Sequence, residues 1–239
     1  LVALVAFAKE SGIERIALST NGSADFELYE RLATKGVNDF SISLDSCCAS
    51  TGDKMAGDLP VWNRVVENIR RIAEISYTTV GVVLTEENQG ELQQIIDFSS
   101  SLGVADVRII PAAQVAKKHQ GLVCESALDA HPILSYRVKN FLSGNSVRGL
   151  TVKDNSQCPL VLDDMVVMNG KHYPCIIYMR EHGGEVGKIS GSIKNVRRER
   201  VKWFESHNCL KDEICRNNCL DVCRAYNNKV RATNLRLYG

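Results

Sequence analysis

The sequence of 239 residues has no long apolar run and almost no net charge. No stretch approaches the roughly 20 apolar residues that a membrane-spanning helix needs. The apolar residues 1–8 have no basic region before them and no cleavage-type site after them, so they do not fit a secretion signal. A formal net charge of +1 removes the simplest argument for a nucleic-acid partner. We therefore expect a cytoplasmic protein with no membrane partner.

Several common catalytic signatures are also missing. The sequence has no P-loop, no glycine triplet of the dinucleotide-binding type and no nucleophile elbow. Cysteine, in contrast, is abundant, with nine residues in the chain. Without an export signal, so many cysteines are more typical of metal binding than of disulfides.

The composition changes near residue 150. Residues 1–150 carry 14 basic and 18 acidic side chains, whereas residues 151–239 carry 15 basic and 10 acidic ones. Six of the nine cysteines also lie in the second part. A chain of this length suits one large or two modest domains, and the change in composition favours two.

The first part alternates strand-like and helix-like segments. The predicted strands are 16–20, 39–45, 79–84 and 106–110, and the predicted helices between them are 26–35, 61–75 and 91–102. This alternation predicts right-handed crossovers and a parallel sheet. Four strands are too few for a closed barrel of eight, so we expect further strands upstream of Leu1.

Polar side chains lie along one predicted strand and at the ends of others. Ser41, Ser43 and Asp45 alternate with apolar residues, although a parallel strand covered on both faces is usually apolar throughout. Asn21 and Arg108 lie similarly at strand ends, where ligands gather in parallel α/β folds. The pattern indicates a cleft, and helix capping or turn formation is the alternative role for each residue.

The spacing of the later cysteines suits a metal site. Cys158 and Cys175 flank a predicted hairpin whose turn is Asn169-Gly170, which would bring their thiols together. The remaining four are Cys209, Cys215, Cys219 and Cys223. The last three follow one another at four-residue steps, which predicts a single helical stripe from which not all three thiols reach one cluster.

The residue types leave the identity of the metal open. Four thiolates bind an iron–sulfur cubane. Zinc takes four thiolates as well, or three thiolates and an imidazole, and His207 is nearby. The five histidines otherwise show no ligand spacing. Cys47 and Cys48 are interpreted as a loop thiol pair, and Cys124 receives no role.

Taken in order, these segments resemble the radical SAM superfamily. The segments are similar to strands three to six of the six strands in the partial barrel of that family. They are Ser19-Thr20-Asn21-Gly22, Ser41-Ile42-Ser43-Leu44-Asp45-Ser46, Val82-Val83-Leu84 with Asn88, and Arg108-Ile109-Ile110-Pro111. Cys158 and Cys175, with Gly170 between them, and the crowded later cysteines are similar to a SPASM-type auxiliary-cluster domain.

The resemblance implies an α/β fold in two parts. The expected fold is a partial parallel (β/α)6 radical-SAM-type barrel that lacks its first strands, followed by a small cysteine-rich SPASM-like domain. The expected boundaries are 1–115 for the partial barrel, 116–155 for a connecting helical region and 156–239 for the auxiliary domain.

The resemblance also implies cofactors. Asn21, Ser43 and Asp45 would line a site for S-adenosylmethionine, and Arg108 could pair with the carboxylate of that cofactor. An auxiliary 4Fe–4S cluster would take Cys158, Cys175 and two of the four later cysteines. The enzyme would use a 5′-deoxyadenosyl radical to modify a peptide, protein or small-molecule substrate, with ferredoxin or flavodoxin as the electron donor.

The sequence departs from the family in two ways. It lacks the family's three cysteines spaced by three and two residues, which we expect upstream of Leu1, so the chain alone is expected to be inactive as a fragment of a longer enzyme. The gaps between its last four cysteines are five, three and three residues, where the family has two, five and three.

Two other interpretations remain open. One is a catalytically inactive remnant. The other is a zinc-stapled basic module that contacts nucleic acid through residues 194–202. That basic run is more typical of a solvated helix face, with Val196 and Val201 packed inward.

Overall fold

The computed structural model describes residues 1–112, 129–189 and 191–238. The chain divides into two compact units, Leu1–Gly144 and Asn145–Gly239. Among the described helices, none is long and apolar enough to cross a membrane. Cys124, to which the sequence assigns no role, lies outside the described residues.

The first unit is built on a parallel four-stranded sheet with the strand order β1-β2-β3-β4. The strands are β1 (Ala17–Thr20), β2 (Asp39–Ser43), β3 (Tyr77–Leu84) and β4 (Asp106–Pro111). The helices are α1 (Val2–Glu10), α2 (Phe26–Lys35), α3 (Ala49–Met55), α4 (Trp62–Ile75), the short η1 (Gln89–Glu91), α5 (Leu92–Ser101) and α6 (Pro132–Leu142). The predicted parallel sheet is confirmed, with strand ends displaced by one or two residues.

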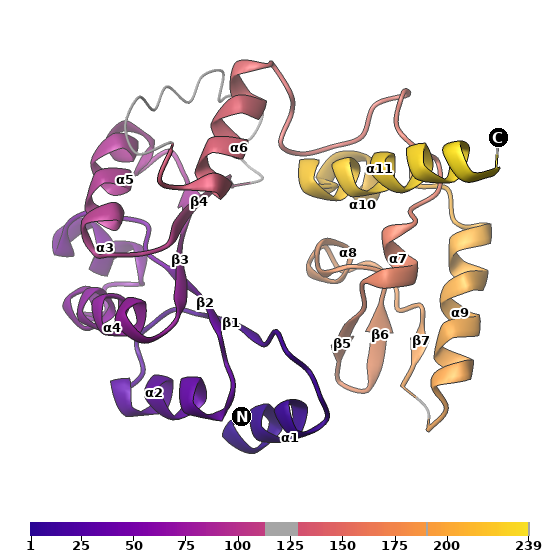
Figure 1. The fold of residues 1–239 in the computed structure, drawn as a ribbon. Helices are drawn as coiled ribbons and strands as arrows, with labels where there is room; N and C mark the ends of the chain where they lie inside the picture. The colour runs from indigo at the N-terminus through magenta and orange to yellow at the C-terminus, as the bar shows by residue number, and fades with distance from the viewer. Residues whose placement is uncertain (113–128, 190, 239) are drawn as a thin grey trace. The chain divides into compact units, whose positions relative to one another are not determined.

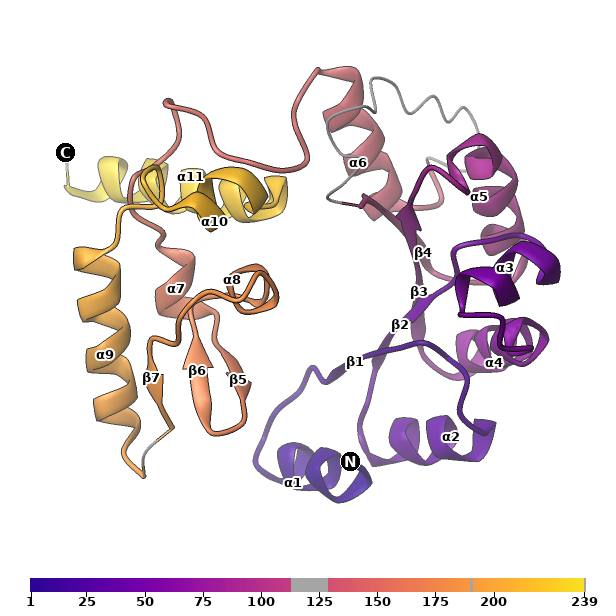
Figure 2. The same cartoon turned by 180° about the vertical axis from the view of Figure 1, so that it is seen from behind.

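Helices α2, α4 and α5 lie on one face of this sheet (Figures 1 and 2). Their fully buried side chains, such as Leu32, Ile69 and Ile95, form one apolar cluster with Phe40 and Ile42 of β2. Because strand side chains alternate, the other face of the sheet carries the less buried residues of each strand. These include Ser41, Ser43, Gly81 and Arg108.

A buried carboxylate fixes α6 to the end of the sheet. Asp106, the first residue of β4, accepts hydrogen bonds from the backbone amides of Ile133 (2.9 Å) and Leu134 (3.3 Å). These amides lie in the first turn of α6 and have no partner within the helix. The expected connecting region 116–155 thus contributes α6 to the first unit, while residues 145–155 belong to the second.

The second unit combines short helices with a small antiparallel sheet in the order β5-β6-β7. Its elements are α7 (Leu160–Asp163), β5 (Val166–Met168), β6 (Lys171–Tyr173), α8 (Ile176–Arg180), β7 (Gly187–Lys188), α9 (Ile193–Ser206), α10 (Glu213–Asn218) and α11 (Asp221–Tyr238). The predicted hairpin is confirmed, since Asn169 (φ 51°) and Gly170 (φ 72°) form the turn between β5 and β6.

The predicted single helical stripe of cysteines is wrong. Cys215 lies in α10, Cys223 lies in α11, and Cys219 lies between the two helices with extended backbone (ψ 129°). The cause is a distant segment, because the amide of Gly149 donates to the carbonyl of Cys219 (2.8 Å) and the amide of Leu150 donates to that of Arg216 (2.8 Å). These two bonds take carbonyls that a continuous helix would use itself.

The inward face of α9 also differs from its predicted form. Val196 is buried as expected, but Val201 is 43% exposed and the charged Arg200 is only 5% exposed. The Arg200 guanidinium donates to the carbonyls of Val161 (2.7 Å) and Tyr173 (3.0 Å), and also to those of Asp164 and Pro174. A planar group with several donors can join α7 to β6 in this way, which an apolar side chain could not do.

Candidate functional site

Three of the four predicted cofactor-binding residues line one cleft of the first unit. Asn21 follows β1, Ser43 ends β2, and Asp45 lies two residues farther along the chain. The cleft has a cavity volume of about 240 Å³, and its wall is completed by apolar residues that include Met55 and Trp62. It lies at the carboxyl ends of the parallel strands, where ligands of such folds bind.

The loop that carries Asn21 is held tightly. Its side-chain oxygen accepts from the backbone amide of Ser23 (3.2 Å) and from the Ser23 hydroxyl (3.0 Å). Gly22 has φ 75°, and a Cβ there would lie 2.7 Å from a methyl group of Ile42. The buried Asn68 of α4 donates to the carbonyl of Gly22 (2.7 Å) and to that of Ala24 (2.8 Å). Asn68 was not among the predicted residues, because its role depends on a loop 46 positions away.

The Asp45 carboxylate is joined to the neighbouring strand. Its Oδ1 accepts from the backbone amide of Val83 (2.6 Å). Burial raises the pKa of Asp45, and this hydrogen bond partly opposes the rise. The fully buried Asn88 donates to the carbonyls of Asp45 (2.9 Å) and Val83 (3.0 Å), so it ties the ends of β2 and β3 together.

Arg108 lies elsewhere on the sheet and is not part of the cleft lining. Its Nη2 donates to the hydroxyl of Ser41 (2.8 Å), two strands away. The side chain passes over Gly81 of β3, where a Cβ would lie 3.4 Å from Nη2. The structure therefore brings Asn21, Ser43 and Asp45 together and places Arg108 apart from them.

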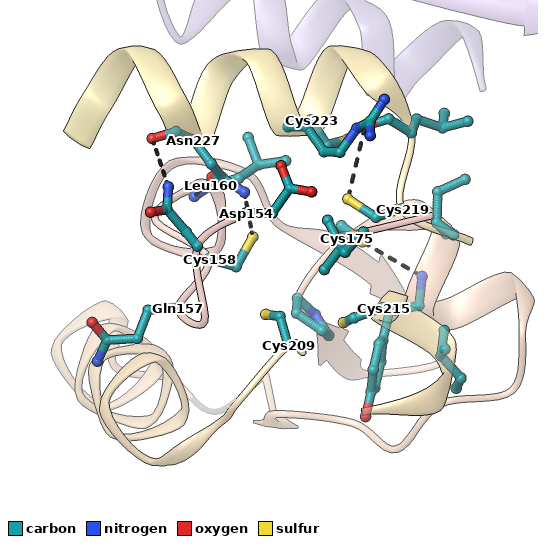
Figure 3. Close-up of a pocket in the computed structure, with 18 of the residues that line it drawn as sticks. Asp154, Gln157, Cys158, Leu160, Cys175, Cys209, Cys215, Cys219, Cys223 and Asn227 are labelled. Carbon is teal, nitrogen blue, oxygen red and sulfur yellow. Dashed lines mark hydrogen bonds between the residues drawn. The ribbon is translucent and has the colours of Figure 1, made fainter. Parts of the chain in front are cut away.

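All six predicted metal ligands line one pocket of the second unit. Figure 3 shows Cys158, Cys175, Cys209, Cys215, Cys219 and Cys223 gathered around it. The rest of the lining is largely apolar and includes Leu160, Ile177 and Trp203. The hairpin brings Cys175 to this pocket, and the break between α10 and α11 allows all of the last three cysteines to reach it.

Neighbouring thiols in this pocket shift one another's pKa values. This holds for Cys158 with Cys209, for Cys209 with Cys215, and for Cys219 with Cys223. The Cys209 thiol, and then burial, raise the pKa of Cys158. The neighbouring Cys219 thiol lowers the pKa of Cys223, and Cys223 raises that of Cys219.

Two further thiols also hold their protons at neutral pH. Burial raises the pKa of Cys175 to about 11. The pKa of Cys209 rises to about 12, because the neighbouring Cys158 thiol, which lowers it, is outweighed by the Cys215 thiol and by burial. Thiolates crowded in an apolar pocket need a compensating positive charge, and a metal ion supplies it. The donor set therefore fits a thiolate-bound metal or cluster.

Two further residues touch the thiols: Asn227, which is an addition to the predicted set, and His207, which the sequence offered as a zinc ligand. Asn227 of α11 donates to Cys158 Sγ (3.2 Å) and accepts from the amide of Leu160 (3.0 Å). It lies four residues after Cys223, so helical spacing could have identified it. His207 Nε2 lies 3.8 Å from Cys215 Sγ, although the histidines show no ligand spacing in the sequence. Burial lowers the pKa of His207.

Comparison with known proteins identifies relatives of the first unit. Residues 1–99 match the family model of the radical SAM superfamily. A probable GTP 3′,8-cyclase of Saccharolobus solfataricus is 29% identical over 112 residues, which cover 46% of this chain and 36% of the relative. A probable GTP 3′,8-cyclase of Saccharolobus islandicus is 27% identical over the same length. The match therefore spans about a third of the length of these relatives.

Solved structures share the fold over more of the chain. The crystal structure of Streptococcus suis SuiB has a TM-score of 0.55 and 14% identity, covering 82% of this chain and 51% of SuiB. SuiB bound to S-adenosylmethionine has a TM-score of 0.54 and 14% identity, covering 90% of this chain and 57% of that one. With the parallel sheet, these similarities confirm the predicted α/β fold class.

Proposed function

We propose that this chain, whose residues 1–99 match the family model of the radical SAM superfamily, is part of an enzyme that cleaves S-adenosylmethionine reductively. The observation that carries the proposal is the cleft lined by Asn21, Ser43 and Asp45 at the carboxyl ends of β1 and β2. When S-adenosylmethionine is bound beside a reduced 4Fe–4S cluster, it supplies a 5′-deoxyadenosyl radical that abstracts hydrogen from a substrate.

The chain's own residues would bind and orient the cofactor. Ser43 is exposed on the open face of β2 and offers a hydroxyl, while Asn21 offers an amide. Asp45 accepts a bond from β3, so its carboxylate is fixed in direction at the rim of the cleft. The Arg108 guanidinium lies over Gly81 and is held there by its bond to Ser41, so it places a positive charge on that face of the sheet, outside the cleft itself.

For the second unit we propose an auxiliary 4Fe–4S cluster held by four of the six pocket cysteines. The support is the chemistry of the donors, because four thiolates are the normal ligands of such a cluster. The apolar lining would exclude water from it. In the proposed enzyme, the second unit is the SPASM-like auxiliary-cluster domain.

We propose a peptide or protein as the substrate. SuiB bound to its precursor peptide SuiA has a TM-score of 0.51 with 93% of this chain, whereas the match to the probable GTP 3′,8-cyclase covers 46% of it. A small molecule is the second candidate because of that match. GTP added to the active protein should not raise the yield of 5′-deoxyadenosine. A clear rise with GTP would show that the substrate is the nucleotide and not a peptide.

Reductive cleavage tests the proposal in the natural gene product that contains these 239 residues. With dithionite and S-adenosylmethionine it should release 5′-deoxyadenosine, measured by liquid chromatography. Ser43→Ala and Asp45→Asn should each lower the rate about tenfold, because each removes a polar contact worth roughly 1–2 kcal/mol. Ser50→Ala, at an exposed hydroxyl of α3, is the matched control and should keep the full rate.

Absence of 5′-deoxyadenosine would contradict the proposed activity. If the gene product with an intact site cluster releases no 5′-deoxyadenosine, the chain is part of a catalytically inactive remnant. The 239-residue chain alone should give none, because it carries no cysteine triplet spaced by three and two residues. Substantial product from the chain alone would contradict the assignment of its domains.

A further inference from the structure

Three ligand atoms of the second unit lie closer together than the rest of the cysteine pocket. His207 Nε2, Cys209 Sγ and Cys215 Sγ are all within 4.8 Å of one another. Within residues 1–112, 129–189 and 191–238, no other three His, Cys, Asp or Glu ligand atoms lie so close. We call this group the His207 triad.

The spacing of the triad matches the ligands of a single ion. Zinc bonds of about 2.3 Å to sulfur and about 2.0 Å to nitrogen hold tetrahedral neighbours roughly 3.5–3.8 Å apart. Cys215 Sγ and His207 Nε2 are 3.8 Å apart. An iron–sulfur cubane places several iron and sulfide atoms between its thiolates and needs a wider arrangement. Mixed imidazole and thiolate ligands are also typical of structural zinc.

Neighbouring residues hold the triad in place. The His207 ring stacks on Trp203, with centroids 3.9 Å apart and planes at 16°. Asp212 Oδ1 accepts from the amide of Cys215 (2.8 Å), which fixes the start of α10. Asp212 Oδ2 lies 3.6 Å from His207 Nε2 and accepts from the hydroxyl of Tyr178 (3.0 Å). Its carboxylate is therefore a candidate donor for a fourth position, and Tyr178 orients it.

The other four cysteines form a second group. Cys158, Cys175, Cys219 and Cys223 are the cysteines of the pocket that lie outside the triad. Any three of these sulfurs are more widely spread than the triad atoms, since they do not all fall within 4.8 Å. Four thiols match the ligand number of a cubane.

We propose that the pocket holds two different metal centres. A zinc ion is bound by His207, Cys209 and Cys215, with Asp212 in the fourth position. The auxiliary cluster takes the other four cysteines, Cys158, Cys175, Cys219 and Cys223. The cluster assignment rests on the proposed function, whereas the zinc site stands on the triad geometry alone.

Metal analysis of the chain purified without oxygen tests both centres. We expect about one zinc, four iron and four acid-labile sulfide per chain. X-ray absorption at the zinc edge should show two sulfur and two nitrogen or oxygen neighbours, and this measurement requires no variant. Zinc without iron would contradict the cluster and leave the zinc site standing. Iron without zinc would do the reverse.

Matched substitutions separate the two ligand sets. His207→Gln and Cys215→Ser should lose the zinc and keep the iron, while Cys219→Ser should lose the iron and keep the zinc. His182→Gln, at an exposed histidine, and Cys47→Ser are controls that should keep both. About eight iron with no zinc, or a loss of iron in Cys215→Ser, would overturn the proposal in favour of a second cluster.

Discussion

The two adjacent thiols after β2 have opposite surroundings. Cys48 Sγ lies 3.4 Å from each of the hydroxyls of Ser50 and Thr51, and it accepts a longer bond from Ser46. These bonds, with that to Ser50 the largest effect, lower the pKa of Cys48 to about 7. Burial, and then the charge of Glu91, raise the pKa of Cys47. A thiolate is present above its pKa, so at neutral pH only Cys48 is substantially ionised.

We therefore predict selective alkylation of Cys48. At pH 7 iodoacetamide should modify Cys48 at least about tenfold faster than Cys47, and its rate should rise with a midpoint near pH 7. Mass spectrometry of Cys47→Ser and Cys48→Ser proteins measures each thiol separately. In a Ser50→Ala, Thr51→Val protein the midpoint should move upward. Equal rates at the two thiols would show that the hydroxyls do not act on Cys48.

Single residues show what the sequence can and cannot predict about the cleft. Asn21, Ser43 and Asp45 could be placed together, because the ends of adjacent parallel strands meet at one edge. The hydrogen-bond partner of Arg108 could not be predicted, because its bond to Ser41 depends on the space that Gly81 leaves in the strand between them. The sequence did offer His207 as the imidazole of a zinc site, but it could not show that Cys209 and Cys215 are the thiols beside it, because Trp203 and α10 position the ring in three dimensions.

At the scale of elements, local patterns predicted more than long-range contacts did. The strands of the first unit and the Asn169-Gly170 hairpin follow from alternation and turn chemistry within a few residues. The break between α10 and α11 does not follow from local sequence, because it is imposed by the amides of Gly149 and Leu150, which lie about 70 positions away. A four-residue cysteine spacing alone therefore predicts one continuous helix where the structure has two.

The element α9 depends on its buried arginine. Arg200 joins α7 and β6 through several carbonyls and contacts His172 Nδ1 (3.2 Å), whose Nε2 lies 3.0 Å from Glu199 Oε2. Arg200→Met would leave these carbonyls buried without donors, which we expect to cost about 3 kcal/mol of unfolding free energy. Urea unfolding of the metal-loaded protein, followed by tryptophan fluorescence, measures it, since Trp203 lies on the same helix.

The control for this substitution is on the same helix. Arg198 is exposed, so Arg198→Met should change the unfolding free energy by less than about 0.5 kcal/mol. Arg200→Lys should recover only a part of the loss, because an ammonium group cannot reach all the carbonyls that the planar guanidinium does. Equal stability of the Arg200→Met and Arg198→Met proteins would contradict a structural role for Arg200.

At the scale of the whole molecule, the two units have unequal apolar cores. In the first unit, 23 buried apolar residues form one continuous cluster. Among the described residues of the second unit, the buried apolar side chains are Val147, Val161, Tyr173, Val196 and Cys209. A domain of about 95 residues with so small a core needs another source of folding energy. The proposed metal binding by the pocket cysteines would supply it, since binding free energy then becomes folding free energy.

Removal of the metals should therefore unfold the second unit selectively. In the full chain treated with chelator and reductant, backbone amides of α9, α10 and α11 should exchange with deuterium at rates close to those of an unfolded chain. Amides of β2, β3 and β4 should stay protected, because the apolar cluster around them contains no metal ligand. Cys175→Ala should reproduce this pattern without chelator, and Cys47→Ala should leave both units protected. Persistent protection of α9 to α11 in the metal-free chain would show that the small core and the Arg200 contacts suffice to fold the second unit.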